Sequence, residues 1–425
     1  MIVFLGLVTL FATIAQWVSF RRLFTYVQKE LHFKPGTYLP RATVILPCKG
    51  LDPGFAENIG KLMQQQYTDA DGIPQFEVIF AVAEESDPAY SHLKKIVDQE
   101  KNVKTKIVVA GIDSRRAQKV NNQLAALEQM SNESAVIVFV DSDVIARKDF
   151  LRYLTAHLND PTVGATTGYR FYIPFGHNWA PLLRSLWNRM SAWEMADPGY
   201  AFAWGGAMAI TRENFAAAKI AQAWERSCDD DLALTTAVKG LGLKVRFVPQ
   251  CLVASNGDGS VAEIIEWTNR QLILTKVYYP KLWRKAIYRA SILTAWLIAV
   301  LSSVVMAFAH WDPHFLLATC TGLTLLPVEI WFLLQAQKLW YEVLLSNSRM
   351  NSDITENLVL QPDYGDPGDE KMNKAYADSF WKFTLALPLA HLVLPWMTLY
   401  SVITNRIKWR GINYELKSPT ETVTI

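Results

Sequence analysis

Uncharged apolar stretches long enough to span a membrane lie in both terminal parts of the chain and frame a more polar middle. Residues 1–20 carry no charge, and Arg21 and Arg22 follow at once. A helix of about 20 apolar residues crosses the hydrocarbon core of a bilayer. A cleaved signal peptide carries its positive charge before the apolar stretch, whereas here the charge comes after it. Residues 1–20 are therefore predicted to form an uncleaved transmembrane anchor.

Two further apolar stretches stand close together in the C-terminal third. Ser291–Trp311 and His314–Gln337 are separated only by Asp312 and Pro313. This pattern predicts a transmembrane helical hairpin within residues 286–337. Residues 338–382 are rich in polar residues and are predicted to form a loop.

Residues 383–404 are apolar but contain Pro388 and Pro395, which remove backbone donors and kink helices. Three arrangements remain open for this membrane segment: a span, a re-entrant segment or a hairpin. A span would carry the basic tail, residues 405–425, to the outside, against the tendency of positive residues to stay cytoplasmic.

Two stretches, Trp179–Trp193 and Trp267–Trp283, interleave aromatic and aliphatic residues with basic ones. Such helices lie in the plane of lipid headgroups, although a helix of the protein core has the same pattern. Both interpretations remain open.

The middle of the chain, residues 40–285, alternates β-branched runs with helix-like segments. The runs are Ala42–Leu46, Phe76–Val82, Lys106–Val109 and Ala135–Val140. This alternation predicts an α/β domain in which helices cover both faces of a parallel sheet. Ligands of such sheets bind at the carboxyl ends of the strands.

Composition narrows the class of protein. Charged residues make up 19% of the chain, below the roughly 25% of ordinary soluble domains. The net charge of +2 provides no basic field for nucleic acid, so no nucleic-acid partner is expected. Four scattered cysteines form no disulfide pattern, and the basic residues after the anchor favour the cytoplasm. The sequence predicts an integral membrane protein with its α/β domain on the cytoplasmic face, and it specifies no oligomeric state.

The sharpest chemical signal is Asp141-Ser-Asp143, which ends a buried strand. Positions i and i+2 of an extended chain point the same way, so two carboxylates meet there. Mg²⁺ and Mn²⁺ prefer such oxygens and also bind phosphate. The alternative is a solvated turn.

Two other segments carry candidate residues. Asp230 and Asp231 stand where a helix is predicted to begin. They are interpreted either as a general base or as ordinary helix caps. Gly205 and Gly206 fall within a strand pattern, which indicates close approach of a ligand or a β-bulge.

Taken together, these motifs resemble those of membrane-bound family 2 type glycosyltransferases, in particular the ceramide glucosyltransferases and their bacterial homologues. The matching segments, in order, are the anchor, Pro47-Cys-Lys-Gly50, Glu84–Pro88, Lys119–Asn122, Asp141–Asp143, Trp204–Gly206, Asp230–Asp231, the C-terminal membrane helices and the tail motif Trp409–Tyr414.

The resemblance implies a nucleotide-diphospho-sugar transferase (GT-A-like) mixed sheet with helices on both faces. It also implies donor binding by Glu84 or Asp87, Lys119, Asn122, Asp141 and Asp143, with Mg²⁺ or Mn²⁺ on the last two. Asp231 matches the catalytic base and Asp230 its acidic neighbour, although a slip of one residue would exchange them. Gly205, Gly206 and Trp267 match the acceptor and leaving-group side.

One position departs from the resemblance. The family carries Gln or Arg, two residues, then Arg-Trp, whereas this chain has Glu263 and Glu266 before Trp267. Arg270 and Gln271, one turn further on, are expected to replace the lost contacts. Two carboxylates beside a diphosphate would otherwise be unfavourable.

The sequence thus predicts transfer of a hexose, with inversion, from a UDP-sugar such as UDP-glucose to a hydroxyl of a lipid acceptor. A ceramide-like lipid and diacylglycerol remain open as acceptors. The alternative is a non-catalytic membrane scaffold or lipid-binding relative, which the two acidic replacements would suit.

Overall fold

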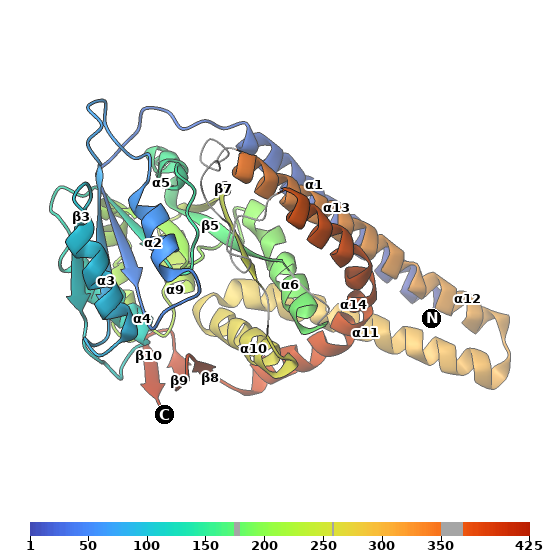
Figure 1. Cartoon of the computed structure of the whole chain (residues 1–425). Helices are drawn as coiled ribbons and strands as arrows, with labels where there is room; N and C mark the ends of the chain where they lie inside the picture. Colours follow the sequence, from blue (N-terminus) through green and yellow to red (C-terminus); the bar gives the residue numbers. More distant parts are fainter. Residues whose placement is uncertain (174–178, 257–258, 350–368) are drawn as a thin grey trace.

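A mixed seven-stranded sheet lies at the centre of the polar middle of the chain (Figure 1). This computed structural model describes residues 1–173, 179–256, 259–349 and 369–425. The strand order is β3-β2-β1-β4-β6-β5-β7. The strands are β1 Ala42–Pro47, β2 Phe76–Val82, β3 Lys104–Val109, β4 Val136–Val140, β5 Val163–Ile173, β6 Ala207–Thr211 and β7 Lys244–Asn256. Because β6 runs antiparallel to β4 and β5, the sheet is mixed, and the wholly parallel sheet predicted from alternation alone is wrong.

Helices cover both faces because consecutive side chains of a strand point to opposite sides. Val44 and Leu46 pack in one hydrophobic layer, and Ile45 packs in the other. The first layer contains α2 Phe55–Met63, α3 Pro88–Gln99 and α5 Phe150–Ala156. The second contains α4 Gln118–Leu127, α7 Arg212–Ala217, α8 Ile220–Trp224 and α9 Asp231–Gly240. The fully buried Ile and Leu side chains each contribute about 1.5–3 kcal/mol of transfer free energy to this core.

The parallel pairing of β1 with β4 sets the place of the site. Ile45 lies opposite Phe139, so the two strands end at the same edge of the sheet. The loops that follow them, residues 48–50 and 141–143, therefore leave the sheet side by side.

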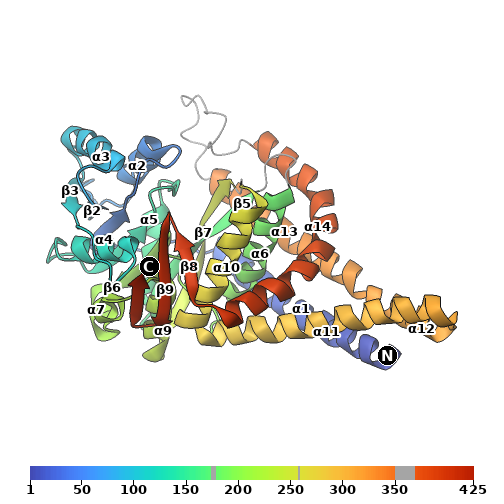
Figure 2. The ribbon, with the colours of Figure 1, turned by 90° about the horizontal axis from the view of Figure 1, so that it is seen from below.

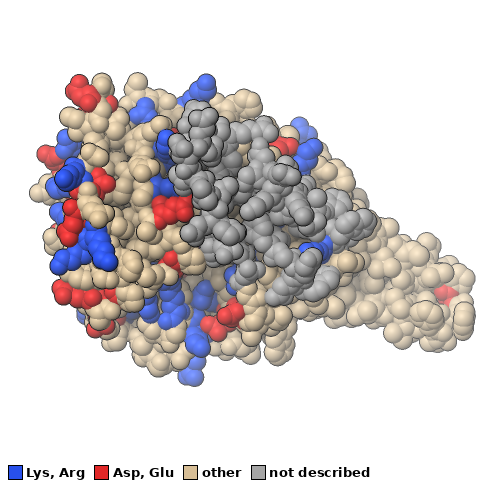
Figure 3. Space-filling view, in the orientation of Figure 1, with Lys and Arg blue, Asp and Glu red and all other residues tan. Residues whose placement is uncertain are grey.

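Long apolar helices project from this domain (Figure 1). By length and composition, α1 Ile2–Leu31, α11 Pro280–His310 and the stretch Pro313–Asn347 can cross a membrane. That stretch consists of α12 Pro313–Leu323 and most of α13 Leu325–Arg349. The end of the projection carries almost no charged side chains in Figure 3. Helices α11 and α12 pack against each other and turn at Asp312 and Pro313, where the hairpin is predicted.

The anchor helix extends eleven residues past the predicted end at residue 20, and its last turns belong to the domain. Leu23 and Val27 are buried against Phe247 and Trp340. The buried Glu30 lies 2.9 Å from His157 Nε2 and 2.6 Å from Arg246 Nη2. The domain is therefore fixed to the anchor by packing and by hydrogen-bonded charges.

The predicted loop of residues 338–382 is wrong at both ends. Helix α13 continues to Arg349, and α14 Asp369–Ile403 begins well before the expected membrane segment. The middle of the predicted loop lies outside the described residues. Since α14 is one helix that contains Pro388 and Pro395, the hairpin arrangement of residues 383–404 is excluded.

The C-terminal tail packs onto the α/β domain as a small sheet of β8 Arg406–Trp409, β9 Ile412–Ser418 and β10 Glu421–Thr424 (Figure 2). Thr424 Oγ1 donates to Ser114 O, and Leu416 is buried in the second layer. The tail and the domain therefore share one side of the membrane. Within α14, Leu385–Ile403 is long and apolar enough to cross a membrane, so a span and a re-entrant segment both fit this helix.

The two amphipathic stretches form α6 Trp179–Ala192 and α10 Val261–Tyr278 followed by the start of α11. Helix α6 contacts β5, α10 and α14. Leu182, Leu186 and Trp187 are buried there. This burial favours the core interpretation for α6 over a helix in the headgroup plane.

We predict that the turn after α11 and the tail lie on opposite sides of the membrane. A cysteine in place of His310 should react in intact cells with a membrane-impermeant maleimide. A cysteine in place of Ile425 should react only after permeabilisation, because the tail packs on the domain that the sequence predicts to be cytoplasmic. Both variants and the control carry Cys320→Ser, because Cys320 is exposed whereas Cys48, Cys228 and Cys251 are buried. Labelling of the Ile425→Cys variant in intact cells would contradict this topology.

Candidate active site

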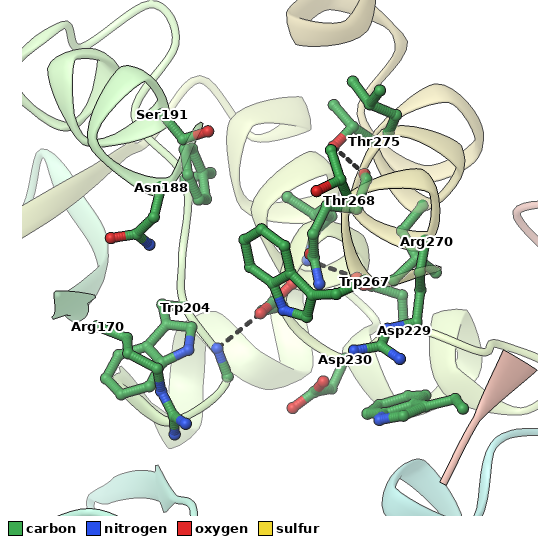
Figure 4. A pocket seen from close by; sticks show the side chains of 18 of the residues that line it. Arg170, Asn188, Ser191, Trp204, Asp229, Asp230, Trp267, Thr268, Arg270 and Thr275 are labelled. Atoms are coloured by element: carbon green, nitrogen blue, oxygen red, sulfur yellow. Dashed lines mark hydrogen bonds between the residues drawn. The ribbon is translucent and has the colours of Figure 1, made fainter. Parts of the chain in front are cut away.

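A cavity of about 560 Å³ opens where β1 and β4 end. Its lining includes these residues selected from the sequence: Lys119, Asn122, Asp141, Asp143, Gly205, Asp230, Asp231, Trp267, Arg270 and Gln271. Figure 4 shows Trp204 and Trp267 between α6 and α10, with Asp229 and Asp230 beneath them. The cavity continues past α10 to α11 and α14.

The two aspartates after β4 are both held by cations. Lys119 Nζ lies 2.9 Å from Asp141 Oδ1. Arg170 of β5 donates to both oxygens of Asp143, at 2.7 and 2.6 Å. Burial would raise the pKa of Asp143, but the Arg170 guanidinium outweighs it and leaves this pKa below its usual range. Burial and the charge of Asp143 raise the pKa of Asp141 despite Lys119 and Arg170. Three carboxylates, those of Asp141, Asp143 and Asp230, share the two cations Lys119 and Arg170.

Three consecutive aspartates at the start of α9 have three different partners. Asp229 Oδ1 accepts hydrogen bonds from the backbone N–H groups of Leu232 and Ala233, so it is the helix cap. Asp230 Oδ2 accepts from Gln123 at 2.9 Å and lies 3.0 Å from Lys119 Nζ. Asp231 Oδ2 accepts from the backbone N–H of Gly205 at 2.7 Å. Capping therefore accounts for Asp229 and leaves Asp230 and Asp231 for other roles.

Asp231 has the ionisation that a general base needs. Burial, with the charge of Asp230, raises the pKa of Asp231 to about 7, although Lys119 and the Gly205 N–H lower it. A base works best when its pKa lies near the operating pH. Asp230 is instead fixed by Lys119 and Gln123, which suits a structural partner.

The paired glycines precede β6 rather than lying within a strand, so their predicted strand placement is wrong. A Cβ on Gly205 would stand 2.6 Å from Asp230 Oδ2 and 2.8 Å from Lys119 Nζ. A Cβ on Gly206 would overlap the Trp204 ring. The close approach that these glycines permit is therefore made by the protein's own side chains.

The first acidic motif lies outside the cavity lining. Glu84 is exposed beyond the end of β2. Asp87 caps α3 through the N–H of Ala89 and also accepts from the N–H of Gly50. Asp87 thus ties the Pro47–Gly50 loop to α3.

The acidic replacements on α10 also face away from the cavity. Glu263 is exposed and forms a capping box with Ser260 at the start of the helix. Glu266 is exposed as well, and neither residue lines the cavity. Trp267, Arg270 and Gln271 of the same helix do line it. A diphosphate bound in the cavity would therefore not contact the carboxylates of Glu263 and Glu266, and the expected repulsion by direct contact is absent.

Sequence reasoning missed Arg170, whose guanidinium lies 5.0 Å from the centroid of the Trp204 ring. The signal was a single arginine between aromatic residues in the strand pattern Tyr169-Arg-Phe-Tyr172. Gln123, Asp229 and the side chain of Trp204 were also missed.

The mixed sheet with helices on both faces agrees with the predicted GT-A-like fold class. The sequence model of glycosyl transferase family 21 matches residues 2–346, and the chain belongs to this family. The resemblance to ceramide glucosyltransferases is thereby confirmed at the level of the family. Among solved structures, the chain is similar to the mannosyltransferase PcManGT from Pyrobaculum calidifontis in complex with GDP-Man and Mn²⁺. The identity is 16% over 94% of this chain and 96% of that chain, with a TM-score of 0.45.

We predict that Glu266→Gln changes glycosyl transfer little, by less than about threefold, because an exposed carboxylate outside the cavity is screened by water. Arg270→Gln, one turn away in the cavity lining, should lower transfer about tenfold or more if it contacts the diphosphate. The measurement is transfer of labelled hexose from UDP-hexose to extracted lipids. Loss of activity in the Glu266→Gln variant would show that this carboxylate takes part in the site.

Proposed function

We propose that this membrane protein transfers a hexose from a UDP-sugar, with UDP-glucose the donor we favour, to a lipid hydroxyl with inversion, forming a glycolipid. Membership in glycosyl transferase family 21 supports glycosyl transfer from a nucleotide sugar. The observation that carries the finer proposal is one cavity with three features. It contains the Asp141 and Asp143 carboxylates, it contains Asp231 with a pKa of about 7, and it reaches the apolar helices α11 and α14.

On the donor side, Asp141, Asp143, Lys119 and Asn122 surround the place for the nucleotide diphosphate. Neither Glu84 nor Asp87 lines the cavity. In this proposal they act on the uridine side indirectly, because Asp87 holds the Pro47–Gly50 loop. Gly205 presents its N–H to Asp231, while the Trp204 ring covers Gly206. Trp267, Arg270 and Gln271 form the wall nearest the acceptor and leaving group.

Asp141 and Asp143 fit Mg²⁺ or Mn²⁺ as partial ligands. Their carboxylate oxygens are hard donors, and together with Asp230 they make three carboxylates that share the two cations Lys119 and Arg170. No cluster of three or more potential ligands occurs among the described residues. A two-carboxylate set suits Mg²⁺, which commonly takes one or two protein carboxylates plus phosphate oxygens and water. When bound, the ion would neutralise charge on the departing diphosphate.

Asp231 performs the proton transfer in the proposed reaction. Its carboxylate accepts the proton of the lipid hydroxyl while the hydroxyl oxygen forms a bond to the anomeric carbon. The bond between that carbon and the diphosphate oxygen breaks, and both of its electrons leave with UDP. One displacement inverts the anomeric centre, and the products are the glycolipid, UDP and protonated Asp231.

The acceptor side of the cavity suits a lipid. Leu282 and Ala286 of α11 and Leu394 and Thr398 of α14 line it. Farther along, the buried Glu194 lies 2.5 Å from Lys285 Nζ and 2.8 Å from Arg289 Nη1. Lysine and arginine at the end of a membrane helix are typical of the headgroup level. A ceramide-like lipid or diacylglycerol can present its hydroxyl from this side.

The competing scaffold function loses its support in the structure. It rested on Glu263 and Glu266, and both carboxylates lie outside the cavity.

We predict that Asp231→Asn lowers turnover by about 10² to 10⁴, the usual contribution of general base catalysis, and leaves UDP binding nearly unchanged. The asparagine keeps the shape and can still accept from Gly205 but cannot take the proton. Turnover of the unsubstituted enzyme should also fall as the pH drops below about 7, because protonated Asp231 is inactive as a base.

Asp230→Asn is the matched comparison and should mainly weaken folding and donor binding through the loss of a partner for Lys119. If Asp230→Asn is dead while Asp231→Asn keeps near-normal turnover, the two roles are exchanged. If both variants are active, the base lies elsewhere.

We expect EDTA to abolish transfer and Mg²⁺ or Mn²⁺ to restore it, because Asp141 and Asp143 carry uncompensated charge at the proposed diphosphate position. The measurement is hexose transfer before and after chelation and after readdition of each ion. Full activity in excess chelator would refute the metal assignment.

A further inference from the structure

The C-terminal tail lies outside residues 2–346, which the sequence model of the family matches, yet the tail forms one wall of the cavity. The family match ends at residue 346. Trp409, Arg410, Ile412 and Tyr414 line the cavity with the residues described above. Figure 2 shows this small sheet beside α10, and α14 leads directly into it. A segment that merely covered the outside of the domain would not reach the carboxylates of the site.

The turn between β8 and β9 has an unusual backbone conformation. Arg410 has φ +46° and Gly411 has φ +83°, the left-handed pair of a two-residue hairpin turn. Glycine adopts this conformation without cost, whereas a side chain such as that of Arg410 rarely does. A residue kept in this conformation by its surroundings indicates a functional constraint.

Reciprocal hydrogen bonds hold this turn against the loop after β1. Arg410 Nη1 donates to Lys49 O at 2.9 Å, and Lys49 Nζ donates to Arg410 O at 3.2 Å. Arg410 Nη2 lies 3.4 Å from Asp52, whose other oxygen accepts from Ser142 Oγ at 2.7 Å. Ser142 stands between Asp141 and Asp143, so the turn is connected to the donor carboxylates.

The cations around the cavity differ in their partners. Lys119 and Arg170 are occupied by Asp141, Asp230 and Asp143, and these carboxylates raise the pKa of both cations despite burial. Arg270 differs, because burial lowers its pKa and none of the ion pairs among the described residues includes it. Arg270 Nη1 donates to Lys408 O, and its guanidinium lies 5.9 Å from the centroid of the Trp409 ring.

We propose that the β8–β9 turn is a binding element for the diphosphate of the nucleotide, with Arg410 as the residue that contacts it. This proposal rests on the proposed function. The Arg410 side chain is 47% exposed. Its guanidinium makes one hydrogen bond to Lys49 O and a long contact to Asp52, which leaves further N–H donors for phosphate oxygens. Arg270 supplies a second positive charge through its contact with the same hairpin. Guanidinium groups bind phosphate oxygens through paired N–H donors, which a nucleoside without phosphate cannot use.

The experiment compares binding of UDP, GDP and uridine to the full-length protein in detergent, by calorimetry, with Mg²⁺ and again with EDTA. The test variant is Arg410→Asn, because asparagine tolerates the left-handed conformation and removes the charge. The matched control is Arg406→Asn, an exposed arginine of the same hairpin that does not line the cavity. Arg410→Lys keeps the charge and loses the planar pair of donors.

We expect Arg410→Asn to weaken UDP binding about tenfold or more while uridine binding stays unchanged, as for the loss of a charge-assisted contact. Arg410→Lys should lie between, and Arg406→Asn should match the unsubstituted protein. Equal UDP affinity in Arg410→Asn and the unsubstituted protein would overturn the proposal. An equal loss for UDP and uridine would also overturn it, since a purely structural role predicts that result. If the unsubstituted protein binds neither UDP nor GDP, the proposed function itself fails.

Discussion

One buried ammonium group organises the site. Lys119 Nζ, on α4, lies 2.9 Å from Asp141 after β4, 3.0 Å from Asp230 before α9, and 3.2 Å from the carbonyl oxygen of Gly205. A buried charge is stable only when its partners are present, so these three segments must assemble together. Gly205 can occupy its place only because it lacks a side chain, since a Cβ would stand 2.8 Å from this same nitrogen. The ammonium thus joins the proposed donor carboxylates to the start of the helix that carries Asp231.

The same charge separates the roles of two adjacent aspartates. Lys119 and Gln123 fix Asp230, and the negative charge of Asp230 then raises the pKa of its neighbour Asp231. Asp229 takes the capping role that α9 requires, which frees the other two carboxylates from it.

The sequence predicted the features that depend on local pattern. β-Branched runs located β1, β2 and β4, and Asp141 and Asp143 followed because they end one of these strands. Features made by distant segments were not predictable. Arg170 meets Asp143 only because β5 pairs with β6 and β6 with β4, and Arg410 meets Lys49 across 361 positions. The paired glycines show that a local pattern does not identify a distant neighbour. A ligand was expected close to them, but Gly205 approaches the side chains of Asp230 and Lys119.

The path of α14 gives the membrane part a direct connection to the site. The helix lines the cavity with Leu394 and Thr398 and then continues into the tail at β8. Lys276 of α10 holds the joint by donating to the carbonyl oxygens of Ser401 and Thr404, at 2.5 and 2.8 Å. The next residues form the hairpin with Trp409 and Arg410. In the proposed reaction, lipid and nucleotide would thus contact one continuous segment, α14 with the hairpin that follows it. Helix α10, which carries Trp267 and Arg270, holds this segment at its middle.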